Sequence, residues 1–233
     1  MSKLTNGATL FSIWASKDEK DWLEHLATII KNSFSFSPKV RWCARAYAIR
    51  MGISRISKFF QEIGFPVGKK THTVRAPIVI MESNESVKRA FVRGYFDADG
   101  SLGFQKRSYN EEYCEAKKIY HYYPRIYIES ASRDLINDIE NMLDSLGFRC
   151  KVYRRTRCSG KYSAYAIVIK GATQIDKWMN DIKSSNPVHI SKYLVWKKYG
   201  FCPPRLALDQ RLAILEGKIS PKFFYNGGER AQG

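Results

Sequence analysis

The sequence predicts an α+β fold built from two similar halves, and two observations lead to this prediction. Residues 9–64 and 125–182 show the same order of patterns: a strand ending in Ala-Ser, a helix, a basic strand, a strand containing Ala-Tyr-Ala-Ile, and a short second helix. The 233 residues are 44% hydrophobic, enough for the core of one large domain or two small ones. Hairpins that alternate with helices in this order form antiparallel sheets with helices on one face.

The first helix of each half has apolar residues at helical spacing, as expected of a buried face. These residues are Trp22, Leu23, Leu26, Ile29 and Ile30 in the first half and Leu135, Ile136, Ile139, Met142 and Leu143 in the second. The short second helices are expected around residues 56–63 and 175–182. Near the N-terminus, Asn6-Gly7 predicts a turn between two strands.

Cationic and aromatic residues alternate along the predicted strands, so each set lies on one face of its strand. A solvated face would also carry polar residues, but cations interleaved with aromatics and few acids favour a face that contacts DNA, where Arg, Lys and Gln read base edges. The predicted DNA contacts are Lys39, Arg41, Gln105, Arg107, Arg125, Tyr127, Lys151, Tyr153, Arg155, Arg157 and Lys161.

Composition points to the same class of partner. The formal net charge is +17 and the chain has 14 tyrosines, which favours an anionic polymer over a membrane surface because no strongly basic amphipathic helix is visible. No apolar run is long enough to span a bilayer and no signal peptide is evident, so an intracellular location is expected. The five cysteines form no Cys-x-x-Cys pair and the four histidines are scattered, which argues against disulfides and a zinc site.

A helix is predicted between the halves, capped by Ser83 or Asn84, running to about Asp97 and stopped by Gly100. Ala90, Gly94 and Ala98 lie four residues apart on it. A glycine inside a helix costs about 1 kcal/mol relative to alanine, so this stripe of small residues favours close packing against another helix over an exposed face.

The two aspartates at the end of this helix, Asp97 and Asp99, oppose the helix dipole. An ordinary Asp-Gly turn is one explanation. A calcium loop is a poor one, because the later ligands of an EF-hand are absent. A bound divalent cation reverses the unfavourable electrostatics, and beside DNA it would polarise a phosphate and activate water.

These residues resemble a known family. The stretch VRGYFDADG, residues 92–100, is similar to the LAGLIDADG motif of homing endonucleases. Its flanks EIGFPVGKK, APIVIMESNESVKRAF and SLGF match as well, and the similarity covers roughly residues 9–182. The resemblance implies two αββαββα units. Their motif helices pack side by side, and their saddle-shaped sheets straddle double-stranded DNA.

The resemblance also implies roles for single residues. Asp99 would bind Mg²⁺ or another divalent cation at the scissile phosphate, whereas Asp97 would be structural, since residues two apart on a helix do not share a face. Lys170 matches a basic residue that supports catalysis in the family. Arg50 is its approximate counterpart in the first half, because the Ala-Tyr-Ala-Ile segments align with a one-residue slip afterwards. Both would stabilise charge or position water, or else contact phosphates.

The first half departs from the family pattern because no motif helix precedes its hairpin. Three explanations are open: a truncated start, a homodimer in which each chain supplies one motif helix, or a protein that has lost cleavage and kept DNA binding. The expected domains are residues 1–80, the first half without its motif helix; 81–186, the second half; and 187–233, a basic extension with a helical pattern at 206–215 and a partly disordered tail.

The predicted function is site-specific, metal-dependent cleavage of double-stranded DNA by a homing endonuclease. Because no intein splice-junction residues are evident at either end, a free-standing or intron-encoded protein fits better than an intein. The alternatives are an RNA maturase or a DNA-binding protein on the same scaffold, and a basic structural protein with no sequence preference.

Overall fold

The computed structural model describes residues 2–3, 9–52, 54–68, 71–106, 119–156 and 163–225. Along the chain, the first half contains β1 (Ser2–Lys3), β2 (Thr9–Ala15), the 3-10 turn η1 (Lys17–Glu19), α1 (Lys20–Phe34), β3 (Val40–Cys43), β4 (Ala46–Met51) and α2 (Ser54–Glu62). A connection with α3 (Ile78–Met81) leads to α4 (Glu85–Asp99).

The second half repeats the order of the first: β5 (Gly100–Gln105), β6 (Tyr123–Ser130), α6 (Arg133–Ser145), β7 (Lys151–Thr156), β8 (Ser163–Lys170) and α7 (Ala172–Asp181). The C-terminal extension then adds α8 (Pro187–Tyr199), α9 (Leu208–Leu215) and the 3-10 turn η2 (Pro221–Tyr225). The predicted order of two hairpins and two helices per half is therefore confirmed.

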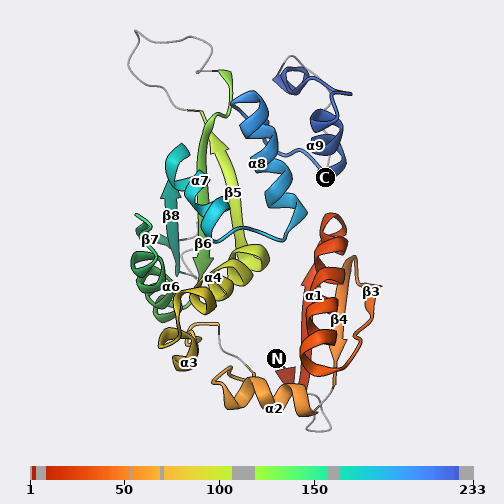
Figure 1. Cartoon of the computed structure of the whole chain (residues 1–233), viewed down its shortest axis with the longest axis vertical. Helices are drawn as coiled ribbons and strands as arrows, with labels where there is room; N and C mark the ends of the chain where they lie inside the picture. The colour runs from red at the N-terminus through yellow and green to blue at the C-terminus, as the bar shows by residue number, and fades with distance from the viewer. Residues whose placement is uncertain are drawn as a thin grey trace.

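Each half has a four-stranded antiparallel sheet, with order β1-β2-β4-β3 in the first and β5-β6-β8-β7 in the second. Helix α1 packs against β2, β3 and β4, while α6 and α7 pack against β6 and β8 (Figure 1). The α+β class and the placement of helices on one side of each sheet agree with the prediction. The other side of each sheet carries none of these helices.

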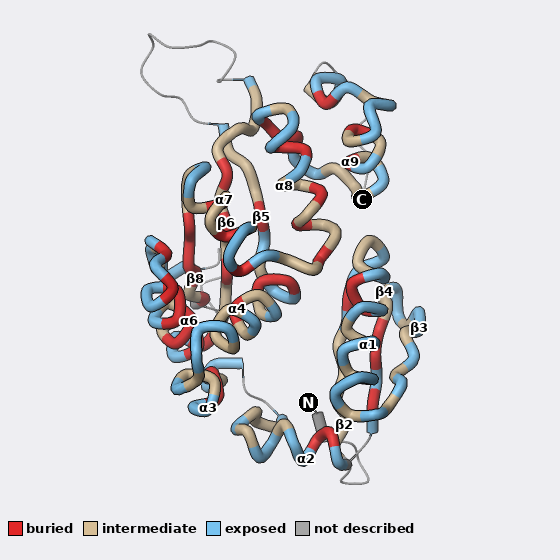
Figure 2. Tube along the Cα trace, viewed as in Figure 1, coloured by how far each residue is buried: buried red, intermediate tan, exposed pale blue. Residues whose placement is uncertain are grey.

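The cores of the two halves lie between sheet and helices, and Figure 2 shows the buried residues following β6, β8 and α6 in one half and α1 and β4 in the other. The first core contains Trp22, Leu23 and Ile49. The second is larger, with Phe96, Trp178 and a set of Ile and Leu side chains from the sheet and α6. Ile29 differs from prediction: it is 46% exposed, because it lies at the edge of the apolar face of α1.

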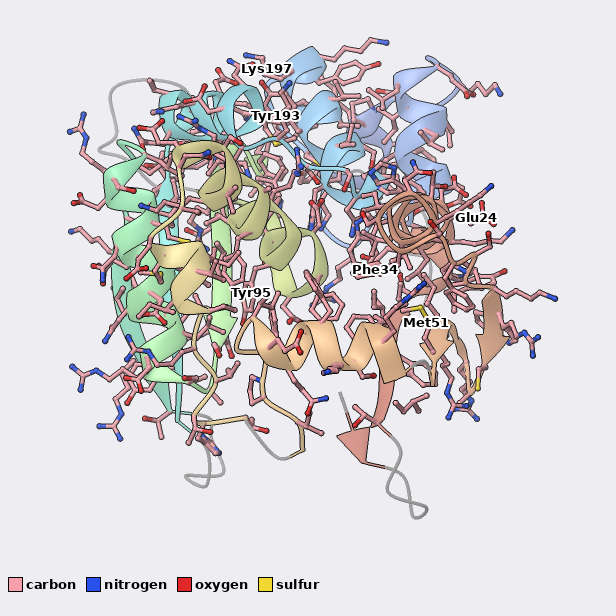
Figure 3. All side chains as sticks on the ribbon, turned by 60° about the horizontal axis from the view of Figure 1, so that its bottom comes forward. Glu24, Phe34, Met51, Tyr95, Tyr193 and Lys197 are labelled. Carbon is pink, nitrogen blue, oxygen red and sulfur yellow. The ribbon has the colours of Figure 1, made fainter. Side chains whose placement is uncertain are left out.

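The connection between halves is fastened to the second half. Ser132 Oγ donates to the Val74 carbonyl at 2.6 Å, and the buried Asp138 carboxylate accepts from Ala76 N at 3.0 Å and pairs with Arg75 at 2.8 Å. Helix α2 lies across the bottom of the molecule between the halves, as the turned view of Figure 3 shows. The predicted domain boundary at residues 80 and 81 falls within α3 and stays a prediction.

Helix α8 of the C-terminal extension lies beside β5, where Trp196 Nε1 donates to the Tyr122 carbonyl at 2.9 Å (Figure 1). Val195, Trp196, Cys202 and Ile214 form a third buried cluster between α8 and α9. No helix among the described residues has the length and hydropathy needed to cross a membrane.

Candidate nucleic-acid interface and metal position

The local structure at both ends of α4 follows from its sequence. Asn84 is the N-cap, and its side chain accepts a hydrogen bond from Val87 N, which confirms one of the two predicted caps. The helix continues to Asp99, two residues beyond the predicted end. A side chain at Gly100 would lie 2.4 Å from Phe96 Cδ2 and 2.7 Å from its carbonyl oxygen. Only glycine therefore lets the chain turn directly from α4 into β5.

The two aspartates of the motif have opposite surroundings. Asp97 is 2% exposed and accepts hydrogen bonds from Ser184 Oγ, from Ser185 N at 2.9 Å and from Ser185 Oγ at 2.7 Å. A buried carboxylate with three donors holds α4 against the segment before α8. This placement agrees with the structural role expected of Asp97.

Asp99 is exposed and begins the turn into β5. Although the residue is exposed, neighbouring protein atoms partly desolvate its carboxylate, and this desolvation raises the pKa of Asp99 above its usual value. Within the described residues, no hydrogen bond or ion pair satisfies the Asp99 carboxylate. The Asp99 charge acts on the nearby Tyr95: burial raises the pKa of Tyr95, and the charges of Asp99 and Glu129 raise it further. The Asp99 carboxylate is thus free to bind a cation.

Strand register places the predicted DNA contacts of the second half on one face of its sheet. Arg125 pairs with Gly103 and Lys170, Tyr127 pairs with Ser101 and Val168, and both Lys151 and Tyr127 lie opposite Val168. Because alternate residues share a face, the open side carries Gln105, Arg125, Tyr127, Lys151, Tyr153, Arg155 and Lys170. The neighbours in between, such as Ile126, Ile128, Ile167 and Ile169, are fully buried on the helix side.

The cations on this face are held in place by aromatic rings and by one acid. Arg125 lies 4.8 Å from the centroid of the Tyr127 ring, and Lys170 Nζ lies 3.4 Å from Tyr153 Oη. The face has few acids, as expected; one of them, Glu129, forms an ion pair with Arg155 at 3.0 Å. Glu129 lies opposite Ala166 and Arg155 lies opposite Ala164, so the two side chains are close together on one face. Arg155 therefore has a protein partner in the absence of DNA.

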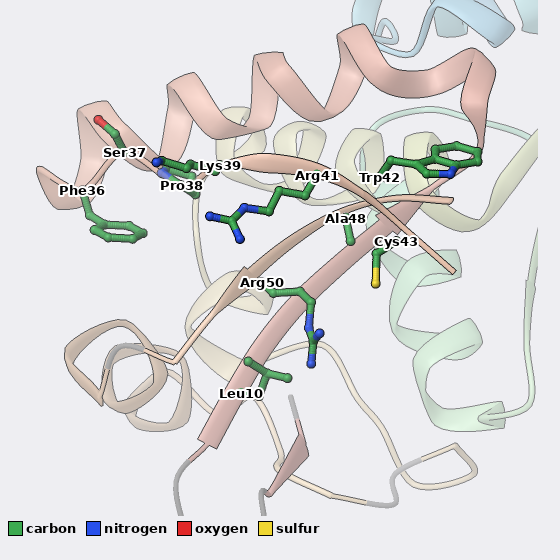
Figure 4. A pocket seen from close by; sticks show the side chains of 10 residues that line it. All are labelled: Leu10, Phe36, Ser37, Pro38, Lys39, Arg41, Trp42, Cys43, Ala48 and Arg50. Carbon is green, nitrogen blue, oxygen red and sulfur yellow. The ribbon is translucent and has the colours of Figure 1, made fainter. Parts of the chain in front are cut away.

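The first sheet has a matching open face. Arg41 and Trp14 both lie opposite Ala48, and Arg50 lies opposite Ser12. Figure 4 shows the Arg41 and Arg50 side chains projecting from β3 and β4 into one hollow, of about 600 Å³, which Lys39 and Trp42 also line. A small buried alanine lies at the middle of each open face, Ala48 here and Ala166 in the second sheet. Each face therefore has a hollow over its alanine, and cationic side chains line that hollow.

The sequence alignment of Arg50 with Lys170 is not supported by register. Tyr47 pairs with Ala15 as Tyr165 pairs with Ser130, so Arg50 corresponds to Val168, and Lys170 corresponds to Gly52. The offset is two residues and not one. Because an even offset preserves the face, Arg50 still lies on the open side of its sheet.

Asp99 and Lys170 are not brought into contact. Lys170 is level with Gly103, four residues beyond Asp99, which corresponds to about 13 Å along the strand, and β6 lies between β5 and β8. The described residues contain no group of three or more His, Cys, Asp or Glu that could hold a metal. A Mg²⁺ ion is nevertheless compatible with Asp99, since this ion is commonly held by one or two carboxylates together with waters and substrate phosphates.

The small-residue stripe of α4 is exposed. Ala90, Gly94 and Ala98 all face outward, and a Cβ atom added at Gly94 would have no atom within 4 Å. The predicted close packing against another helix is therefore not provided by the described part of this chain. Three predicted DNA contacts, Arg107, Arg157 and Lys161, lie outside the described residues, as do the Asn6-Gly7 turn and the tail after residue 225.

Sequence reasoning missed a buried polar cluster where the C-terminal extension meets the first half. Asn186 Nδ2 donates to Glu19 Oε1 at 2.6 Å, and Leu208 N donates to Asp18 Oδ2 at 3.1 Å. Two local signals were available: Ser16-x-x-Glu19 has the form of a capping box, and Asn186-Pro187 that of a helix start. Neither signal identifies the residue at the other end of each hydrogen bond, because Asn186 lies 167 residues from Glu19 and Leu208 lies 190 residues from Asp18.

Comparison with known proteins shows which proteins this chain is similar to. Residues 86–182 match the family described as LAGLIDADG-like domain. The chain is 27% identical over 184 residues to the tRNA-splicing ligase RtcB of Pyrococcus furiosus, and 28% identical over 137 residues to the replication factor C small subunit of Methanocaldococcus jannaschii. These matches cover 77% and 59% of this chain but only 18% and 6% of those proteins.

Solved structures share the fold. I-DmoI in complex with its target DNA and Mg has a TM-score of 0.52 at 15% identity, covering 79% of this chain and 86% of that one. A double mutant of I-SmaMI has a TM-score of 0.56 at 12% identity, covering 99% and 93%. The resemblance predicted from the sequence is confirmed: residues 86–182 match the LAGLIDADG-like domain, and the chain has the fold of LAGLIDADG homing endonucleases.

Proposed function

We propose that this protein is a site-specific DNA endonuclease that cleaves double-stranded DNA by divalent-metal-dependent hydrolysis. The observation that carries the proposal is the contrast within the motif, where Asp97 is buried and fully hydrogen-bonded while Asp99 is exposed and unneutralised at the start of β5. A free carboxylate at the start of β5, in a molecule whose two sheets each carry a basic open face, is the arrangement expected of a metal ligand at a DNA backbone. An origin inside an intron is part of the proposal.

The open faces supply the DNA affinity. Arg and Lys side chains that neutralise phosphates release condensed counterions, so affinity falls steeply with salt. In the second half Lys151 and Lys170 line a hollow, and on the first face Arg41 and Arg50 do the same. Tyr127 and Tyr153 fix neighbouring cations and shape the surface that meets the groove.

The chemistry is centred on Asp99. A divalent cation bound there, together with DNA phosphate oxygens and water, would polarise the phosphate and lower the pKa of a coordinated water. Asp99 must be ionised to bind the cation. Lys170 and Arg50 contribute positive charge along the DNA path, at positions set by their strands, while Asp97 keeps the end of α4 fixed. Structures of I-DmoI with Mg, Mn and Ca support the choice of a divalent ion.

The exposed stripe of α4 favours a second proposal, that a partner helix completes the site. A second copy of this chain would supply an equivalent helix and a second Asp99, and a segment absent from this sequence would serve equally. Sedimentation at micromolar concentration distinguishes these two partners: a dimer supports the second copy. A strict monomer with full double-strand cleavage would contradict the need for any partner helix, whereas the endonuclease proposal would stand.

Asp99→Asn tests the proposed function. We expect single-turnover cleavage of a selected duplex in Mg²⁺ to fall by at least about 10³-fold, because the ligand charge is lost, while binding in Ca²⁺ changes by less than about threefold. Wild-type cleavage should rise with pH as Asp99, whose pKa burial raises, becomes ionised. Asp144→Asn, an exposed acid on α6, is the matched control.

Two outcomes would contradict the proposal. Unchanged cleavage by the Asp99→Asn protein would remove Asp99 from the chemistry. Tight, specific DNA binding by a wild-type protein that never cleaves would favour a DNA-binding protein, and specific binding of a folded intron RNA would favour a maturase.

A further inference from the structure

For DNA to lie across both open faces, the two halves must hold a fixed relative position. In the described residues, no helix packs on the small-residue stripe of α4 to hold them together. The stripe of Ala90, Gly94 and Ala98 is exposed. The connection through residues 63–84 is fastened to the second half at Ser132 and Asp138. A direct tie between the halves lies elsewhere, where the η1 turn meets the start of α8 and α9 (Figure 1).

Asn186 is the centre of this tie. Its side chain is fully buried, and Nδ2 donates two hydrogen bonds, to Glu19 Oε1 at 2.6 Å and to the Asp97 carbonyl at 2.9 Å. Its Oδ1 accepts from Val188 N at 2.9 Å, which caps α8. One amide therefore joins the first half, the end of α4 and the C-terminal extension.

Each partner of Asn186 is itself fixed. Burial alone would raise the pKa of Glu19, but hydrogen bonds from Ser16 and Asn186 lower it, so the carboxylate stays ionised and accepts at both oxygens. Asp18, the residue before Glu19, accepts from Leu208 N at 3.1 Å. Two adjacent acids of η1 are thus bound by the C-terminal extension.

On the α4 side, the segment before Asn186 binds the motif. Ser184 and Ser185 donate to the Asp97 carboxylate, and Ser184 Oγ accepts from Asn186 N at 3.1 Å. Asp99 follows Asp97 by two residues. The position of Asp99 relative to the first sheet is therefore transmitted through residues 184–186 to Glu19.

We propose that residues 184–186 and the start of the C-terminal extension form an interdomain brace, in which Asn186 is a positioning residue. The brace fixes the first sheet relative to Asp99, so that DNA bound across both open faces presents its phosphate at the carboxylate. This role in cleavage rests on the proposed endonuclease function, whereas the mechanical role of the brace does not.

The test separates the brace from the helix cap. Asn186→Asp keeps the acceptor that caps α8, but it removes both donated hydrogen bonds and faces Glu19 with a like charge. Glu19→Gln keeps an acceptor at Oε1, and Glu19→Leu removes it. Asn180→Asp, exposed on α7, is the matched control. The readout is the distance distribution between spin labels on unnatural amino acids at Lys31 of α1 and Asp144 of α6, in DNA-free protein.

We expect the Asn186→Asp and Glu19→Leu proteins to show a clearly broadened distribution, the double variant to be no broader than either, and Glu19→Gln and Asn180→Asp to match wild type. Single-turnover cleavage should fall about 10- to 100-fold in the broadened variants, as expected when a reacting group is displaced by about 1 Å. If the Asn186→Asp and Glu19→Leu proteins both kept the narrow wild-type distance distribution, the brace would be overturned. A broadened distribution in a protein that never cleaves would retain the brace and contradict only the endonuclease function.

Discussion

The two halves of the molecule share one element order but differ in what lies behind their sheets. In the described residues, the core of the second half has eighteen buried residues and that of the first has six. Part of the difference comes from α4, which contributes Val92 and Phe96 to the second core and has no described counterpart in the first; α6 adds five more, including Ile136, Ile139 and Leu143. The same strand pattern can therefore form a four-stranded sheet with an open basic face over either a large or a small core.

The difference also separates two roles within one fold. The second half has the helix with the candidate metal ligand, and its core holds that helix rigid through Phe96, whose ring packs against Trp178 at 5.1 Å. The first half contributes a basic face, and its attachment depends on the η1 turn and the C-terminal extension. The second half is thus stabilised from within, and the first half largely through its junctions.

The most direct way to break this comparison is a matched pair of core substitutions. Leu143 in α6 and Leu23 in α1 are both fully buried. Leucine-to-alanine changes in cores cost about 2–5 kcal/mol, with larger values where the surroundings cannot collapse. We expect Leu143→Ala to lie near the upper end and Leu23→Ala near the lower end, measured by urea unfolding followed by circular dichroism. Equal losses would mean that the two cores are equally rigid.

The junction between halves should be sensitive to acid. His189 of α8 lies against Phe96 with ring centroids 4.4 Å apart, and burial, followed by the charge of Lys192, lowers the pKa of His189 from 6.5 to about 4. Between these values the unfolded chain takes up a proton that the folded chain does not, so the free energy of unfolding falls as the pH falls. From pH 7 to pH 5 this amounts to about 2 kcal/mol.

His189→Phe keeps the aromatic contact and removes the titration. Its urea midpoint should therefore fall less than that of wild type between pH 7 and pH 5. His25→Phe, at an exposed position on α1, should behave as wild type. If the His189→Phe protein showed the full wild-type pH dependence, the loss of stability would have to come from another group.

The smallest expected effect tests whether the stripe on α4 is unpartnered in solution. Because a Cβ atom at Gly94 meets open space, Gly94→Ala should raise the free energy of unfolding by up to about 1 kcal/mol. If a second copy packs its own helix there, the same methyl group would weaken the association, and sedimentation would show a larger monomer fraction. The sign of the change thus decides between an exposed face and an interface.

Local patterns predicted the parts of the fold that depend on neighbouring residues. The spacing of Leu135, Ile136 and Ile139 located a buried helix face, Asn84 marked a helix start, and alternation along Lys151–Thr156 placed the cations on one side of a strand. The equivalence of strand positions between the halves was predicted less well. The sequence aligned Arg50 with Lys170, whereas strand pairing makes Arg50 the counterpart of Val168. A short repeated segment such as Ala-Tyr-Ala-Ile does not specify where its strand ends.

The sequence by itself determined the α+β class, the twofold repeat and the motif that contains Asp97 and Asp99, because periodicity and helix caps act over a few residues. The tertiary structure decided that Asp99 remains free, that Arg155 is paired with Glu129, and that Asn186 joins Glu19 to the end of α4. These contacts link residues far apart in the chain, and the burial and partners that determine them exist only once the two halves are packed.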